Sequence, residues 1–366
     1  MQPALVSLLG GLILACASTA EPPVAGPVAP AASSTAAAPT ALMVGREVVF
    51  EGMCDASGAV ELDAGTFMIA DDEDNVLRVY DAARGGPPLA AVDVSPGVGL
   101  QPRGKKRPRM PELDLEAATR IGDRAYWLTS HGRNSSGRLR PERMRFFATT
   151  LPGPGAAAAQ VEVVGSSDRL LDALIADPRF ARFGLAAAAE RAPKADGGLN
   201  LEGMTAGPDG RLLLGFRNPV PDRLALLFTV HAPDRLLAGD GEGEGAGVGA
   251  DAIGPPIRLD LGGQGVRALT WWRDRYLIVA GHHASGGGPS RLYAWDGAGA
   301  PTAIAVDLTG YNPEATFSPD GAAELMLLSD DGEVAIDGQP CKELTDHGRR
   351  RFRGVWLRPT PAGADG

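Results

Sequence analysis

The chain has 366 residues, 44% of them hydrophobic, which is enough for one large domain or two ordinary ones. It carries 49 glycines and 30 prolines but only 5% aromatic residues, and this composition favours many short strands and turns over long helices. The formal net charge of −10 argues against general nucleic-acid binding, which needs a basic face, so we expect no nucleic-acid partner.

An apolar stretch of twelve residues, ALVSLLGGLILA, stands close to the N-terminus. It is too short to span a membrane and has the length of the apolar part of an export signal. The stretch ends in ILAC, which resembles the lipobox of bacterial lipoproteins, so we expect Cys16 to become the lipid-acylated first residue of the mature chain. No Lys or Arg precedes the stretch. The alternatives are plain secretion with cleavage after Ala20 and a misassigned start of the chain.

A segment rich in Pro, Ala and Ser, Glu21–Thr40, follows the apolar stretch and shows no hydrophobic period. Such a segment does not form a packed core, so we expect an unfolded tether between an acylated cysteine and a folded body. The predicted organisation is a signal peptide at 1–15, a flexible tether at 16–43, a β-propeller domain at 44–359 and a disordered tail at 360–366. The protein is then exported, either periplasmic or anchored to the outer membrane only through its lipid, with secretion as the alternative.

The body contains five units of short apolar runs, which start near residues 51, 116, 202, 267 and 314. The runs are rich in Val, Ile, Leu and aromatic residues and are bounded by Gly, Pro, Asp or Asn. In the third unit, for example, NLEGMTAG is followed by RLLLGF, LALLFTV and PIRLDL. Four short strands joined by tight turns are typical of a β-propeller blade. The chain is therefore predicted to be all-β, with a single propeller of five four-stranded blades.

The last unit shows only three clear strands, and the missing one stands at the front of the body. GREVVF, Gly45–Phe50, precedes the first unit as PIRLDL precedes the fourth. We predict that it is the outer strand of the last blade and closes the ring, which removes exposed sheet edges. A six-bladed ring is possible if residues 166–193 hide a degenerate blade. That segment reads better as an inserted helix, either a lid or a decoration, with one apolar face formed by Leu170, Leu171, Leu174 and Ile175.

Apart from Cys16, the chain has two cysteines, Cys54 and Cys341. In an oxidising compartment an even number of cysteines predicts a disulfide. Ring closure would place Cys54 in the blade next to the one that holds Cys341. Two buried free thiols are the alternative.

An acidic residue recurs near the start of the first strand of a unit. In a propeller this strand lines the central channel, so we expect four glutamates to converge around the axis, while Arg267 takes the fourth unit's place. Crowded carboxylates raise one another's pKa and need a counter-charge. Ca²⁺ meets that need with six to eight oxygen ligands; backbone N–H groups together with Arg267 are the structural alternative. The candidate metal ligands are Glu51, Glu116, Glu202 and Glu314.

The ends of the second strands carry a further set of polar residues, one group in each unit. Loops on a rigid scaffold are common places for binding and catalytic residues. A histidine there can act as a general base and an arginine can grip a phosphate or carboxylate. The candidate catalytic residues are His131, His282 and His283. The candidate substrate-binding residues are Arg133, Arg217, Asn218 and Arg267. Turn chemistry is the competing explanation, and we prefer it for Asp330 and Asp331.

Arg103–Arg109, RGKKRPR, forms a basic stretch in the connection between the first two units. It can meet phosphate or lipopolysaccharide, but solvated loop charge is the simpler interpretation.

Three blocks resemble a bacterial family named domain of unknown function 3616. They are EGMCDASGAVELDAGTFMIADDEDNVLRVYD, NLEGMTAGPDGRLLLGFRNP and the closing PCKEL with RFRGVWL, and together they span Phe50–Leu357. The family name brings no activity with it. The glutamates at the strand starts are also similar to those of phytase-like esterase and calcium-dependent nucleotidase propellers. That resemblance implies acids from successive blades around a central cation, and Arg267 departs from it.

Two functions from different classes follow. The first is a metal-dependent hydrolase of phosphoesters or related anionic small molecules, with Ca²⁺ held by the carboxylates, arginines on the anion and a histidine handling the proton. The second is a non-catalytic scaffold that recognises an envelope component through the same face. In either case we expect a monomer.

Overall fold

The structure is a computed structural model that describes residues 39–63, 65–152, 161–237, 251–284, 288–319 and 322–360. The predicted signal peptide, the acylated Cys16, most of the tether and all but one residue of the tail lie outside these ranges. Within them, no helix has the length and apolar character that crossing a membrane requires.

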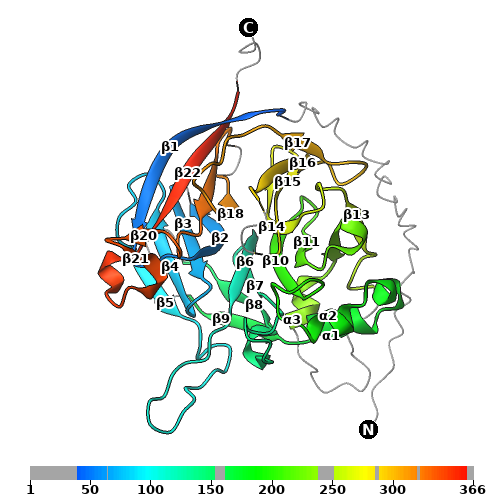
Figure 1. Ribbon diagram of the computed structural model, residues 1–366, viewed down its shortest axis with the longest axis horizontal. Helices are drawn as coiled ribbons and strands as arrows, with labels where there is room; N and C mark the ends of the chain where they lie inside the picture. Colours follow the sequence, from blue (N-terminus) through cyan, green and yellow to red (C-terminus); the bar gives the residue numbers. More distant parts are fainter. Residues whose placement is uncertain are drawn as a thin grey trace, which may run out of the picture. The chain divides into compact units, whose positions relative to one another are not determined.

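The body is built from five four-stranded antiparallel sheets, which Figure 1 shows around a common centre. The first blade contains β2 (Ala56–Asp63), β3 (Thr66–Asp71), β4 (Val76–Asp81) and β5 (Ala90–Asp93). The second contains β6 (Leu115–Ile121), β7 (Arg124–Thr129), β8 (Phe146–Thr150) and β9 (Val163–Ser167). The third contains β10 (Asn200–Ala206), β11 (Leu212–Asn218), β12 (Ala225–Val230) and β13 (Ile257–Leu259). The fourth contains β14 (Gly265–Trp272), β15 (Arg275–Gly281), β16 (Arg291–Trp295) and β17 (Thr302–Ile304).

The fifth blade combines both ends of the body. Its strand order is β18 (Pro313–Phe317), β19 (Leu325–Ser329), β22 (Arg351–Pro359) and β1 (Leu42–Glu51). The prediction of five blades, closed by an N-terminal strand, is confirmed. In β1 the fully buried ring of Phe50 stacks on Phe352 of β22 at 4.9 Å and meets Phe67 of the first blade edge-on at 5.2 Å. This aromatic contact therefore joins the fifth blade to the first.

Apolar side chains fill the spaces between neighbouring blades. The described residues form five such clusters, one between each pair of adjacent blades around the ring. The second strand of each blade is buried along nearly its whole length because both of its faces meet an adjacent blade. This explains why these strands read as continuous apolar runs instead of alternating ones.

The predicted disulfide is present and joins Cys54 to Cys341. Cys54 lies between β1 and β2, and Cys341 begins the short helix η5 (Cys341–Glu343), which follows the hairpin of β20 (Ala335–Ile336) and β21 (Gln339–Pro340). The bond closes a loop of 287 residues, and a bond of this kind stabilises a fold by about 2–4 kcal/mol.

The segment predicted as an inserted helix forms three short ones, α1 (Leu170–Ala176), η3 (Pro178–Phe183) and α2 (Leu185–Ala189). A proline after Asp177 ends α1 early, because proline does not continue a helix. Leu170, Leu171 and Leu174 are buried as expected, but Ile175 is 37% exposed, so its place on the apolar face is corrected. Instead Phe180 packs edge-on against Phe228 of β12 at 6.0 Å. The insertion is no degenerate sixth blade.

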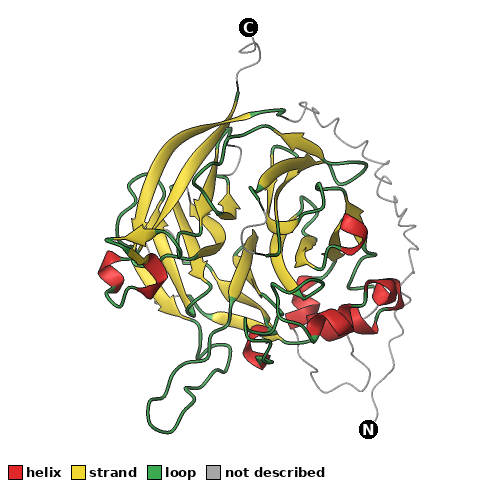
Figure 2. Ribbon diagram, in the orientation of Figure 1, coloured by secondary structure: helices red, strands yellow, loops and turns green. Residues whose placement is uncertain are grey.

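The other helices within the described residues are short and lie in connections, as Figure 2 shows. They are α3 (Pro233–Leu237), η1 (Pro141–Arg143), η4 (Pro221–Arg223) and η6 (His347–Arg349).

Candidate functional site

A cleft of about 1010 Å³ opens at the end of the channel where the second strands of the blades finish. Polar residues at or shortly after the end of every blade's second strand line it: Asp72, Asn134, Arg217, His282 and Asp330. The polar residues at equivalent positions of the five units therefore lie around one cleft. The volume is at the upper end of the roughly 300–1,000 Å³ of ordinary small-molecule sites.

Three of the four predicted glutamates reach this cleft. Glu116 of β6, Glu202 of β10 and Glu314 of β18 line both the cleft and the narrow channel beneath it. Glu51 does not, and its alignment is corrected. It is the last residue of β1, the outermost strand of the fifth blade, and it is exposed. The first blade contributes Gly58 to the channel wall instead, because its inner strand begins five residues after Glu51.

Two buried arginines neutralise the glutamates of the third and fifth blades. Arg217 donates from Nη1 to Glu202 Oε1 at 2.6 Å, and Asn200 donates to the same oxygen. Arg267 forms an ion pair with Glu314, and its Nη1 donates to Asn312 Oδ1 at 2.5 Å. Burial, followed by repulsion from Arg217, lowers the pKa of Arg267 to about 10. The structural alternative for the acids of the channel, neutralisation by protein cations, thus fits these two glutamates.

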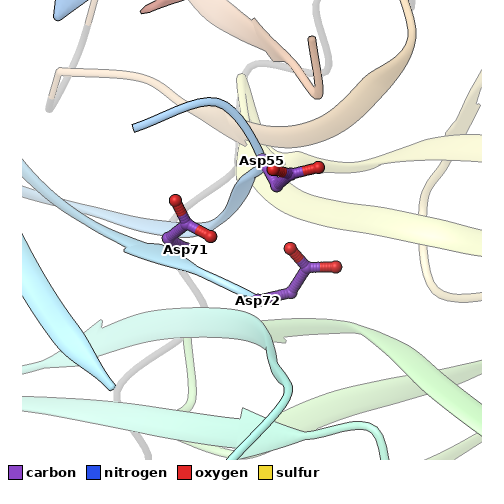
Figure 3. A group of neighbouring side chains, drawn as sticks. All are labelled: Asp55, Asp71 and Asp72. Carbon is purple, nitrogen blue, oxygen red and sulfur yellow. The ribbon is translucent and has the colours of Figure 1, made fainter. Parts of the chain in front are cut away.

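A second acidic group lies at the edge of the channel and has a different environment. Asp55 precedes β2, Asp71 ends β3 and Asp72 follows it. One carboxylate oxygen from each of the three lies within 4.8 Å of the others, and Figure 3 shows the three side chains around a common space. We refer to these residues as the aspartate cluster. Asp330, which directly follows β19, adds a carboxyl group from the fifth blade that faces Asp55.

The aspartate cluster is short of positive charge. Burial, followed by Asp330, raises the pKa of Asp55 to about 9. Burial, followed by Asp74, raises that of Asp71 to about 7. Burial, followed by Glu116, raises that of Asp72 well above its usual range. Oδ1 of Asp72 is also buried without a hydrogen-bond partner. Buried acids without counter-charge are costly, and oxygen ligands at this spacing suit a hard divalent cation such as Ca²⁺.

The three predicted histidines differ in position. His282 lines the cleft, and its backbone oxygen accepts a hydrogen bond from Arg217 Nε at 2.9 Å. His283 is half-buried and does not line the cleft. His131 is fully buried beside the carbonyl oxygen of Thr129, and burial lowers its pKa to about 4. Because it does not line the cleft, the geometry does not support His131 as a general base.

Two predicted substrate-binding residues instead hold the helical insertion in place. Arg133 donates to the carbonyl oxygen of Ala189 at 2.8 Å and pairs with Glu190. Asn218 is 1% exposed and donates to the carbonyl oxygens of Pro193 and Ala195. Neither lines the cleft. Their assignment as anion-binding residues is corrected, whereas Arg217 and Arg267 do lie in the cleft wall.

The basic stretch between the first two blades is also part of the cleft. Arg103 and Arg109 form an antiparallel bridge, and Arg103 pairs with the buried Glu142 at 3.0 Å. This holds Arg109 at the cleft. Arg109, Arg140 and Lys194 line the cleft and form no ion pair with any described carboxylate, which leaves three cations for an anionic ligand.

Sequence reasoning missed Asp55, Asn200 and Asn312. Asp55 stands inside the first quoted block, but the alignment put Glu51 in its role. Asp71 and Asp72 belong to the polar group at the end of the first unit's second strand, but the sequence does not indicate that they lie beside Asp55. The available signal for a site at this place was the run of acidic residues, DDED, directly after an apolar strand.

Comparisons with known proteins give a match to one family model over part of the chain, and no activity. The model of a family described as "Protein of unknown function (DUF3616)" matches residues 143–308. This confirms the resemblance over the third and fourth blades and part of the second. The matched range contains the NLEGMTAGPDGRLLLGFRNP block, while the first and last quoted blocks lie outside it. No curated protein matches the sequence.

Solved structures with a similar course of the chain include propeller enzymes. A glutaminyl cyclase from Myxococcus xanthus is 12% identical, with a TM-score of 0.43 and coverage of 88% of this chain and 100% of that one. An aldose sugar dehydrogenase from Streptomyces coelicolor, in a PQQ-bound form, is 14% identical, with a TM-score of 0.45 and coverage of 88% and 99%. These are distant similarities and carry no argument about the function of this chain.

Proposed function

We propose that the protein binds a divalent cation, Ca²⁺ in the first instance, at the aspartate cluster, and hydrolyses a phosphoester or related anionic small molecule in the cleft above it. The observation that carries the proposal is the meeting of Asp55, Asp71 and Asp72 within 4.8 Å. These carboxyl groups lack the arginine partners that Glu202 and Glu314 possess. The proposed cation site is therefore not the ring of four glutamates expected from the sequence. It is formed by three aspartates of the first blade.

The cleft wall supports an anionic ligand. When bound, the cation supplies neutralisation of phosphoryl oxygens and polarisation of the scissile centre. Arg109 and Arg140 line the same cleft and can bind the distal part of the ligand by charge-assisted hydrogen bonds. His282 is the predicted histidine that lies in the cleft wall, so we assign it the proton taken from the attacking water as the new P–O bond forms. The P–O bond to the alcohol breaks, the alkoxide takes a proton from solvent water, and His282 afterwards returns its proton to solvent.

Metal binding and turnover test the proposal separately. Calorimetric titration of the chelator-treated protein with Ca²⁺ should show binding, and Asp72→Asn should weaken it by about tenfold or more. Asp296→Asn, an exposed turn residue outside the cleft, is the matched control. Phosphomonoester and phosphodiester hydrolysis should stop on chelation and fall in His282→Ala while cation binding persists. Wild-type protein that takes up no divalent cation contradicts the proposal.

A binding scaffold is the second candidate, and one observation favours it. Of the three histidines expected to handle a proton, His131 is buried away from the cleft and His283 does not line it. A protein that binds Ca²⁺ and an anionic ligand but shows no turnover across phosphoester, lactone and ester panels would have this function.

We further propose that the protein works outside the cytoplasm as a lipoprotein acylated at Cys16. The Cys54–Cys341 disulfide supports an oxidising compartment. Metabolic labelling with a fatty acid should mark the wild-type chain and not Cys16→Ser. A label that persists in the variant contradicts acylation at that residue.

A further inference from the structure

The aspartate cluster lies at the place where the ring is closed. Asp55, Asp71 and Asp72 belong to the first blade, while Asp330 follows β19 of the fifth. The chain passes from β1 of the fifth blade to β2 of the first through residues 52–55, so Asp55 itself ends the crossing. A cation held there contacts the first blade and lies beside the fifth.

Two contacts fix the segment of Asp55 to the fifth blade, and a third closes the fifth-blade loop that makes them. The disulfide joins its neighbour Cys54 to Cys341. The carbonyl oxygen of Cys54 accepts a hydrogen bond from the backbone N–H of Asp331 at 3.0 Å. The N–H of Lys342, next to Cys341, donates to the carbonyl oxygen of Gly332 at 3.1 Å. Both sulfurs belong to residues that are at most 1% exposed, which fits a permanent bond better than one that cellular reductants open and close. We refer to the Cys54–Cys341 disulfide and the hydrogen bond between Asp331 and Cys54 as the clamp.

Gly332 completes the clamp by having no side chain. A Cβ atom built there would lie 1.8 Å from Asp55 Oδ1 and 2.7 Å from its Cγ. The backbone of Gly332 does not have a positive φ, so conformational freedom does not explain the glycine. The carboxyl group of Asp55 occupies the space that any other residue would fill.

We infer that the Cys54–Cys341 disulfide and Gly332 are positioning groups for the cation, and that cation affinity depends on the closed seam between the first and fifth blades. The inference rests on the proposed function. Without the clamp, Asp55 would be free to leave Asp71 and Asp72, and cation binding, which needs the three carboxylates together, would first have to bring it back. Linkage is reciprocal, so a bound cation also holds the seam shut.

The experiment measures the dissociation constant of Ca²⁺ by calorimetry on the full chain. Cys54→Ala combined with Cys341→Ala should weaken binding about tenfold or more, and Gly332→Ala, which keeps the disulfide, should weaken it by a similar factor. The matched control is Ile278→Ala in β15 of the fourth blade, a fully buried residue away from the clamp. It should cost comparable stability and leave the dissociation constant within about twofold.

The outcomes separate this inference from the proposed function. Wild-type protein that binds Ca²⁺, with Gly332→Ala and the Cys54→Ala/Cys341→Ala variant within twofold of it, overturns the inference and leaves the function standing. Wild-type protein that binds no cation overturns both. If the Cys54→Ala/Cys341→Ala variant does not fold, Gly332→Ala decides alone.

Discussion

Two groups of acidic residues lie at the mouth of one channel, and they differ in whether an arginine neutralises them. Glu202 and Glu314 lie near the axis, each in an ion pair with a buried arginine. Asp55 and Asp72 lie at the edge, where burial and other acids raise their pKa values and neither carboxyl group has an arginine partner. The comparison teaches that an acidic site is recognised by its missing counter-charge and not by its number of carboxyl groups.

The largest effect is expected when the positive charge of Arg267, near the axis, is removed. Arg267→Met leaves the buried Glu314 with only its longer, 3.9 Å ion pair to Arg217, and loss of one partner of a buried ion pair costs roughly 3–5 kcal/mol. Denaturant unfolding should show this loss in the free energy of unfolding, with or without Ca²⁺. The double variant Arg267→Met/Glu314→Met should recover most of it. A single variant as stable as wild type would mean that the axis has another source of compensation.

The pH dependence of stability sharpens the contrast. The folded chain holds protons on Asp55 and Asp71 with pKa values of about 9 and about 7, against 3.8 as the ordinary value. These raised values favour the folded state at low pH, and the advantage is lost as pH rises through them. The free energy of unfolding of chelated protein should therefore fall between about pH 4 and pH 9, by at least about 1 kcal/mol.

Saturating Ca²⁺ should remove that fall, because a ligand of the folded state stabilises it by mass action. Asp72→Asn, which removes one of the repelling charges, should flatten the pH profile of the chelated protein. Stability of the chelated wild-type protein that stays level or rises over this range would contradict the assignment of uncompensated acids.

The smallest expected effect concerns the basic side of the cleft. Arg140→Ala should raise KM for an anionic substrate severalfold, and the effect should shrink at high salt because the group lies near solvent. Ca²⁺ affinity should stay unchanged. Arg138→Ala, an exposed arginine in the same loop that does not line the cleft, is the control. Equal effects of the two substitutions would show general surface charge instead of a specific contact.

The architecture was predictable because blades repeat. The four-strand pattern, the number of blades, the closing strand and the disulfide each follow from local spacing or from the composition of the chain ends. Glu116, Glu202 and Glu314 were found for the same reason, since equivalent strand starts face the same axis.

The aspartate cluster was not predictable in the same way. Asp55 lies in the irregular crossing between two blades, where no repeat fixes its direction, and Glu51 copied the motif of the strand starts while belonging to an outer strand. Arg133 and Asn218 lie near the same strand ends as the cleft residues, but their side chains form hydrogen bonds with the segment inserted after β9. These hydrogen bonds depend on which loop packs nearby, and the local sequence does not contain that information.

Anomalous scattering from crystals of the protein grown with Ca²⁺, or with Mn²⁺ in its place, tests the central claim most directly. The account predicts one ion among the carboxyl groups of Asp55, Asp71 and Asp72, with ligand distances near 2.3–2.6 Å for Ca²⁺. An ion bound instead between Glu116, Glu202 and Glu314, or a fully occupied ion elsewhere with the aspartates left bare, would contradict it.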